Sequence, residues 1–190
     1  PLDGDAPIGS LAAFRSFGRA FPHGERFEYR TPLTCAAGRL LEIVSGRPYV
    51  DAVSADVWSR IGAAHDARVT VDVVGFPFAG GGMLATLADI ARYGQALLEE
   101  DSGVFPAAWV RDTREGTNAT RDAFDRNPHA SEDDLAQWAE YRNAFWVVEP
   151  GEIYEALGLF GQVCRINTAA NTVIARFSAR CESARRSLSA

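Results

Sequence analysis

The chain has 190 residues, of which 47% are hydrophobic and 23% are charged, a balance typical of one soluble globular domain with a sizeable core. Its formal net charge of −6 at pH 7 and its isoelectric point near 5.1 argue against a nucleic acid or an anionic membrane as partner. All 19 basic residues are arginine, so the chain contains no Ser-x-x-Lys motif.

The three cysteines, Cys35, Cys164 and Cys181, have no C-x-x-C spacing, and we expect Cys35 and Cys164 to be small buried hydrophobic residues. No metal-ligand spacing occurs, so we expect no metal and no cofactor. No signal peptide and no long apolar run is present. The chain begins with Pro1 rather than Met, from which we expect a piece of a longer gene product. The compartment, cytoplasmic or secreted, and a homodimer both stay open.

The clearest helix of the sequence is expected at residues 31–45, after a shorter one within residues 11–20. Thr31 is a suitable N-cap, Pro32 suits the first turn, and Gly46 is typical of a C-terminal stop. Apolar residues recur in this helix with the spacing of one buried face: Leu33, Ala36, Ala37, Leu40, Leu41 and Val44.

Tyr29 lies just ahead of this helix. The partial positive charge of a helix N-terminus favours an ionised phenolate, which a general base needs. On composition alone, a tyrosine in this position is more often a packing residue. Both interpretations stay open at this point.

Helices are also expected at residues 49–62, from Thr86 onward and after Pro106, with a short strand around residues 69–73. The glycines at 80–82 lack the Lys and Ser/Thr of a phosphate loop and favour a close backbone approach to a cleft. Residues 115–137 are polar and are expected to form a long surface loop that includes His129.

The C-terminal part changes to a period of two. We expect about three antiparallel strands between residues 138 and 180, built from YRNAFWVVE, IYEALGLFGQVCRIN and TVIARFSAR, and then a final helix. The helical part covers roughly residues 1–137. Helices followed by strands predict an α+β fold rather than alternating β-α-β units.

Residues 27–46 read F-x-Y-x-T-x-x-T and continue into a helix that ends in E-x-x-x-G. This stretch resembles the serine beta-lactamase-related hydrolases, which share the fold of class C beta-lactamases and penicillin-binding proteins, and is most similar to the nylon-oligomer (6-aminohexanoate-dimer) hydrolase branch. The similarity continues in order through DVWSRIGAAHDA, GGMLATLADIARYGQALL, FPAAWV, YRNAFWVV and ALGLFGQVCRI. It covers the C-terminal part of such a fold.

The resemblance implies acyl transfer on a small amide or ester by a serine that is activated by lysine and tyrosine. Tyr29 matches that tyrosine. The N–H of Leu159, after Gly158, is expected to bind the oxyanion, and Phe145 matches a tryptophan of the substrate pocket. The alternative for Phe145 is an ordinary aromatic residue of the core. Two positions depart from the family pattern: Phe160 replaces a histidine, and Arg30 replaces a small residue.

The nucleophile and its lysine lie upstream of the tyrosine in this family, so we expect them outside this chain. The chain alone should then be inactive and should expose apolar surface. The leading hypothesis is the C-terminal part of a serine hydrolase. The alternatives are a catalytically inactive homologue that serves as a binding or structural module, and an unrelated α+β binding protein.

Overall fold

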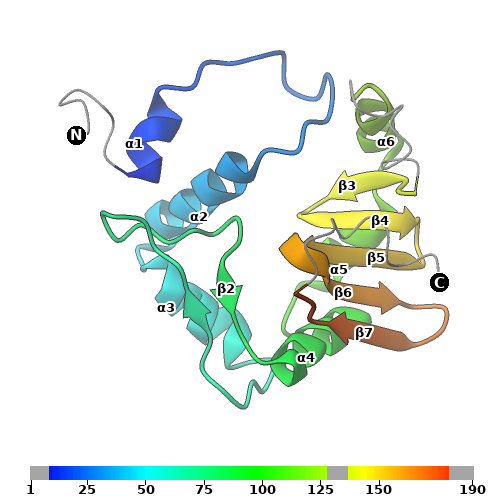
Figure 1. Ribbon diagram of the computed structural model, residues 1–190. Helices are drawn as coiled ribbons and strands as arrows, with labels where there is room; N and C mark the ends of the chain where they lie inside the picture. The colour runs from blue at the N-terminus through cyan, green and yellow to red at the C-terminus, as the bar shows by residue number, and fades with distance from the viewer. Residues whose placement is uncertain (1–8, 128–136, 180–190) are drawn as a thin grey trace.

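The computed structural model describes residues 9–127 and 137–179. Helices dominate the first part of the chain and strands the second (Figure 1). The helices are α1 (Ser10–Arg15), α2 (Thr31–Ser45), α3 (Tyr49–Val53), a π-helix (Ser54–Trp58), α4 (Leu87–Leu98), α5 (Ala107–Glu115), α6 (Asn118–Asp125) and a 3₁₀ turn (Leu159–Gly161). The strands are β1 (Arg68–Val69), β2 (Met83–Leu84), β3 (Glu140–Arg142), β4 (Phe145–Glu149), β5 (Ile153–Gly158), β6 (Gln162–Asn167) and β7 (Thr172–Arg176).

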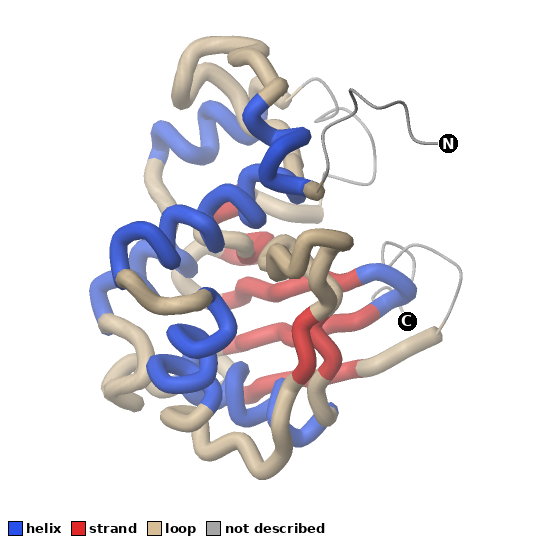
Figure 2. Tube along the Cα trace, turned by 90° about the vertical axis from the view of Figure 1, so that its left-hand side faces the viewer, coloured by secondary structure: helices blue, strands red, loops and turns tan. Residues whose placement is uncertain are grey.

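The main sheet has five strands in the order β3-β4-β5-β6-β7, and every neighbouring pair is antiparallel. A small antiparallel pair, β1 and β2, lies apart from it. Figure 2, seen from the side of α2, shows the strands grouped together with the helices around them. The expected α+β class is therefore confirmed.

The sheet has five strands where about three were expected, because two of the expected strands turn back on themselves. Asn143 and Ala144 adopt φ of 49° and 70°, which makes a tight two-residue hairpin between β3 and β4. Phe160 and Gly161, with φ of 62° and 85°, turn the chain between β5 and β6. Left-handed backbone at non-glycine residues is uncommon, so the sequence gives little signal for these turns.

One face of the sheet packs on α4 and α5 and holds the main core. Its fully or almost fully buried members are Leu97, Val110, Phe145, Val147, Tyr154, Cys164 and Ile166. Close packing is possible at Gly94 of α4, where a Cβ atom would lie 2.5 Å from Val173. Cys35 and Cys164 are both buried and free, as expected, and burial raises the pKa of the Cys164 thiol to about 11. Cys181 lies outside the described residues.

Helix α2 forms where the sequence predicts it and ends at Gly46 in the left-handed conformation, with φ of 67°. Thr31 is its first residue rather than its cap. The expected buried face is wrong: Leu33 and Val44 are 67% and 77% exposed. The helix packs instead through Cys35 and Gly38, the latter so close to Ala79 that a Cβ would lie 2.8 Å from it. The expected exposure of apolar surface is confirmed here.

The other expected helices form, with one correction. Thr86 caps α4 by accepting a hydrogen bond from the Asp89 N–H at 3.1 Å, as the sequence indicates. The expected loop at 115–137 instead contains α6, which begins at a capping box formed by Thr117 and Thr120. His129 and the expected helix after residue 180 fall outside the described residues.

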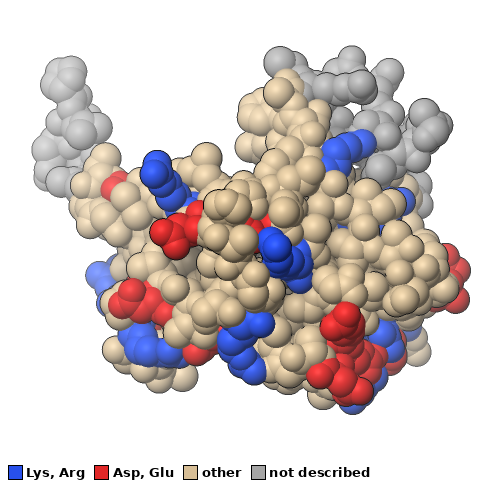
Figure 3. Space-filling model, turned by 90° about the horizontal axis from the view of Figure 1, so that it is seen from below, with Lys and Arg blue, Asp and Glu red and all other residues tan. Residues whose placement is uncertain are grey.

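Acidic and basic side chains lie next to one another on the face shown in Figure 3. Ion pairs such as Arg111–Glu100 and Arg142–Asp112, at 2.8 and 2.6 Å, join neighbouring elements. Among the helices of the described residues, none has the length and apolarity needed to cross a membrane.

Candidate active site

The second face of the sheet carries a cluster of aromatic rings that we call the aromatic face. Its members are Phe27, Tyr29, Phe124, Trp138, Tyr141 and Trp146. They come from the segment before α2, from α6, and from β3 and β4 or the residues just before them. The segment is attached to α6 by a hydrogen bond from the Phe27 N–H to the Ala123 carbonyl at 2.7 Å. Residues distant in sequence thus meet on one surface.

Tyr29 lies at the margin of this face and is 52% exposed. Its ring stacks on Trp146, with centroids 5.7 Å apart and an interplanar angle of 17°. Tyr141 meets the same ring edge-on, with centroids 5.5 Å apart. Burial, and secondarily the neighbouring Tyr29, raises the pKa of Tyr141 well above its ordinary value, which keeps Tyr141 neutral. Tyr29 therefore has a solvent-accessible side chain on a fixed aromatic support.

A pocket of about 240 Å³ adjoins Tyr29. Its lining includes Phe27, Tyr29, Arg30, Leu33, Thr34 and Tyr141. The Arg30 guanidinium, which departs from the family pattern, is paired with Glu28 at 2.5 Å, and Glu28 also binds Arg26 at 2.8 Å. These arginines, Arg30 first, hold the pKa of Glu28 below its usual range. The pocket is thus largely apolar, with a charged group at its border that is already paired.

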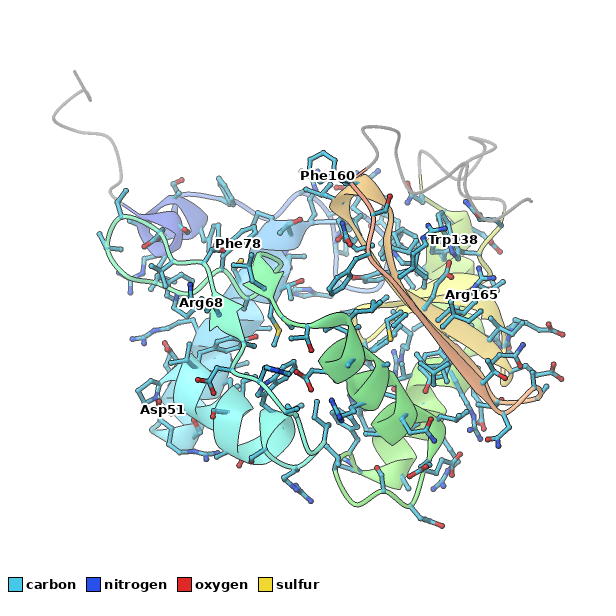
Figure 4. All side chains as sticks on the ribbon, turned by 60° about the horizontal axis from the view of Figure 1, so that its bottom comes forward. Asp51, Arg68, Phe78, Trp138, Phe160 and Arg165 are labelled. Atoms are coloured by element: carbon cyan, nitrogen blue, oxygen red, sulfur yellow. The ribbon has the colours of Figure 1, made fainter. Side chains whose placement is uncertain are left out.

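A buried polar chain supports the aromatic face. Glu155 of β5 is fully buried; it accepts a hydrogen bond from the Trp138 indole N–H at 2.9 Å and one from Arg165 Nε at 2.7 Å. Figure 4 shows Trp138 and Arg165 over the same part of the sheet. Trp138 in turn packs on Trp146, with ring centroids 4.5 Å apart. Both carboxylate oxygens of Glu155 are satisfied, which is the condition for burying a charge.

Gly158 and Leu159 lie at the C-terminal end of the central strand β5, and this end of the strand faces α2 (Figure 1). Trp146, on which Tyr29 stacks, is paired across the ladder with Glu155, three residues before Gly158. At a strand rise of about 3.3 Å per residue, Gly158 lies about 10 Å along β5 from that point. Leu159 is 81% exposed, so its surroundings are open to solvent. The structure thus brings Tyr29 and the Gly158–Leu159 segment to one end of the sheet.

The resemblance implies a place for Phe145 in the substrate pocket, but the structure places it in the core, which was the alternative. It is 3% exposed in the core under α4 and α5, where it contacts Tyr154. The neighbouring Trp146 lies on the aromatic face instead. Because side chains alternate between the faces of a strand, an error of one residue moves a side chain to the opposite face. Trp146 was missed by sequence reasoning for this reason. Trp138 and Glu155 were missed because their hydrogen bond joins residues 17 positions apart and has no local signal.

The glycines at 80–82 bring the chain close to the start of α2 rather than forming a phosphate site. A Cβ atom at Gly80 would lie 2.6 Å from Thr31 Cγ2 and 3.3 Å from Cys35 Sγ. The backbone therefore approaches the first turn of α2, two residues beyond Tyr29, as closely as only glycine allows. Within residues 9–127 and 137–179, no group of three or more His, Cys, Asp or Glu side chains is arranged to hold a metal ion.

Comparison with known protein families shows to which family this chain belongs. Residues 5–188 match the family described as Beta-lactamase, which is nearly the whole chain. The chain belongs to the beta-lactamase family. The hypothesis of an unrelated binding protein is thereby excluded, and the resemblance seen in the sequence is confirmed.

Relatives of this beta-lactamase-family chain agree with that assignment. It is 31% identical to a 6-aminohexanoate-dimer hydrolase of Paenarthrobacter ureafaciens over 160 residues, which cover 80% of this chain and 39% of the relative. A putative 6-aminohexanoate-dimer hydrolase from Bacillus anthracis superposes with a TM-score of 0.80 at 25% identity, covering 96% of this chain and 46% of the other. A putative beta-lactamase from Bacteroides dorei shares the fold, with a TM-score of 0.70 at 22% identity, over 87% and 55% of the two chains. The chain thus spans about two fifths of the length of the curated relative.

Proposed function

We propose that this chain is the C-terminal part of a serine hydrolase that cleaves small amides or esters through an acyl-enzyme, with Tyr29 as its proton carrier. The observation that carries the proposal is the position of Tyr29. It is half exposed beside a pocket, stacked on Trp146, at the end of the sheet where the Gly158–Leu159 segment emerges. The relatives named 6-aminohexanoate-dimer hydrolases support an amide substrate.

The nucleophilic serine and its lysine are supplied from outside these residues, since the chain has no lysine. The serine oxygen attacks the substrate carbonyl carbon, and the serine proton passes to the Tyr29 phenolate. Tyr29 then gives this proton to the leaving amine or alcohol as the acyl-enzyme forms. A water molecule then attacks the acyl-enzyme carbonyl and passes its proton to Tyr29. Tyr29 returns this proton to the serine oxygen as the carboxylic acid is released. The Leu159 N–H donates to the oxyanion in both halves of the reaction.

By itself the chain retains the proton carrier and one oxyanion donor and lacks the nucleophile, so it should not turn over substrate at a significant rate. A catalytically inactive homologue, serving as a binding module, is the second candidate. The replacement of the family's histidine by Phe160, 55% exposed beside Leu159, favours it. Finding a Ser-x-x-Lys motif encoded upstream in the same gene would support the hydrolase instead.

The test is Tyr29→Phe in the protein expressed from its whole gene, assayed with a chromogenic ester and with a linear amide dimer. General acid–base help is worth about a hundredfold to ten-thousandfold, so we expect turnover to fall by that factor, which equals about 3–5 kcal/mol of barrier. The melting temperature should barely change, because the ring and its contacts with Trp146 and Tyr141 remain.

The matched control is Tyr154→Phe, which also removes one phenolic hydroxyl. The Tyr154 hydroxyl is buried and donates to the Leu97 carbonyl at 3.0 Å, on the opposite face of the sheet. Its loss should cost about 1 kcal/mol of stability and leave turnover unchanged. Near-normal turnover in Tyr29→Phe, with a stability loss like that of the control, would mean that Tyr29 is structural and that the proposal is wrong.

A further inference from the structure

We infer that Trp146 is a positioning residue for Tyr29: it holds the phenol ring in the orientation that proton transfer requires. This inference rests on the proposed function, because it concerns how the proton carrier is oriented. The observation behind it is the nearly parallel stacking of the two rings, at 17° and 5.7 Å between centroids. Tyr29 is half exposed, so few other contacts restrain it.

The support itself is rigid. Trp146 contacts five aromatic rings: Phe27, Tyr29, Phe124, Trp138 and Tyr141. Four of these five meet it at steep or tilted angles, between 35° and 82°, which restrains the indole on several sides. Only Tyr29 lies nearly parallel to it, at the solvent-exposed end of the cluster. The indole face is therefore a fixed plane against which the Tyr29 ring is set.

The orientation of Trp146 is fixed in turn by the polar chain beneath it. Trp138 packs on Trp146, and its indole N–H is bound by the buried carboxylate of Glu155. Glu155 is held on its other oxygen by Arg165 of β6. A series of direct contacts, through Trp138 and Trp146, thus connects Glu155 in the sheet to Tyr29. The buried carboxylate of Glu155 therefore supports the aromatic face from below.

The edge contact with Tyr141 completes the restraint. Tyr141 stands at 82° to the Tyr29 ring and at 70° to the Trp146 ring, so the three rings form a corner in which the phenol sits. Proton transfer needs heavy atoms within about 2.6–3.2 Å of each other, and a displacement of about 1 Å can cost about a hundredfold in rate. Loss of the stacked plane removes one side of this corner.

The experiment is a double-mutant cycle in the protein expressed from its whole gene. Trp146→Met fills much of the space with a flexible side chain and removes the flat plane, and we expect kcat to fall about tenfold to a hundredfold while KM stays unchanged. Trp146→Phe keeps a smaller ring, and we expect a loss of about threefold to tenfold. In a Tyr29→Phe background, both substitutions should leave kcat at the value of Tyr29→Phe alone.

Trp109→Met is the matched control, because Trp109 packs against the core on the other face of the sheet. It should lower the melting temperature and leave kcat unchanged. Should Trp146→Met fail to fold, the Trp146→Phe cycle decides alone.

Two results overturn the inference while the proposed function stands: no loss of kcat in either Trp146 variant, or a loss that persists fully in the Tyr29→Phe background. Normal turnover in Tyr29→Phe itself would instead refute the proposed function.

Discussion

Replacing Glu155 by Gln tests the buried polar chain under the candidate site. In the native structure each carboxylate oxygen accepts one hydrogen bond, from Trp138 Nε1 at 2.9 Å and from Arg165 Nε at 2.7 Å. A glutamine amide has one oxygen and one NH₂ group, so in either rotamer an N–H donor faces another donor. One of the two hydrogen bonds must therefore be lost, and the charge of Arg165 loses its partner.

The magnitude follows from burial. Glu155 is fully buried, whereas the Arg165 side chain keeps 24% exposure and can rehydrate in part. A hydrogen bond to a charged group is worth about 1.5–3 kcal/mol, and breaking a fully buried ion pair costs about 3–5 kcal/mol. Because Arg165 is partly solvated, we expect a loss of about 2–3 kcal/mol in the free energy of unfolding.

The assay is urea unfolding followed by tryptophan fluorescence, with the slope of the transition compared to confirm that the unfolded surface is the same. Glu149→Gln is the control on the same sheet, since Glu149 of β4 is exposed and its change should stay within about 0.5 kcal/mol. If Glu155→Gln unfolded at the same urea concentration as Glu149→Gln, the hydrogen bonds of Glu155 would contribute nothing to the free energy of unfolding, and the reasoning would be refuted.

Two further predictions concern the rest of the chain. Hydrogen bonds from the N–H and hydroxyl of Ser10 lower the pKa of Asp72 to about 2, below its unfolded value of about 3.9. This stability is present above pH 4 and is lost as the pH falls toward 2, so Asp72→Asn should flatten the pH dependence of urea midpoints in that range; an unchanged slope would contradict it. Gly116→Ala should cost at least about 2 kcal/mol, because φ and ψ are 59° and −160° and a Cβ would overlap Glu140. The control is Gly103→Ala, where φ is 71° but no atom lies near a Cβ, and it should cost about 1 kcal/mol in the free energy of unfolding. Equal losses in the two variants would show that the overlap with Glu140 costs nothing.

Some of the candidate site could be predicted because its signals are local. The resemblance indicates a role for Tyr29, while its position ahead of α2 and the proline and glycine at the two ends of that helix follow from residues within that stretch. The cap of α4 at Thr86 is local in the same way. The sequence left Phe145 between the substrate pocket and the core, since the face of a strand residue depends on the register with β5 and not on its own identity.

The family, the α+β class, the positions of most helices and the residue expected to carry the proton can all be inferred from the amino-acid sequence, because each depends on neighbouring residues or on a motif. Three features become visible only in the folded chain: two expected strands fold back into hairpins, α2 packs through Cys35 and Gly38, and Trp146 stacks under Tyr29. These features arise from pairing and packing between segments distant in the chain, where the free energy belongs to contacts that no single stretch of sequence contains.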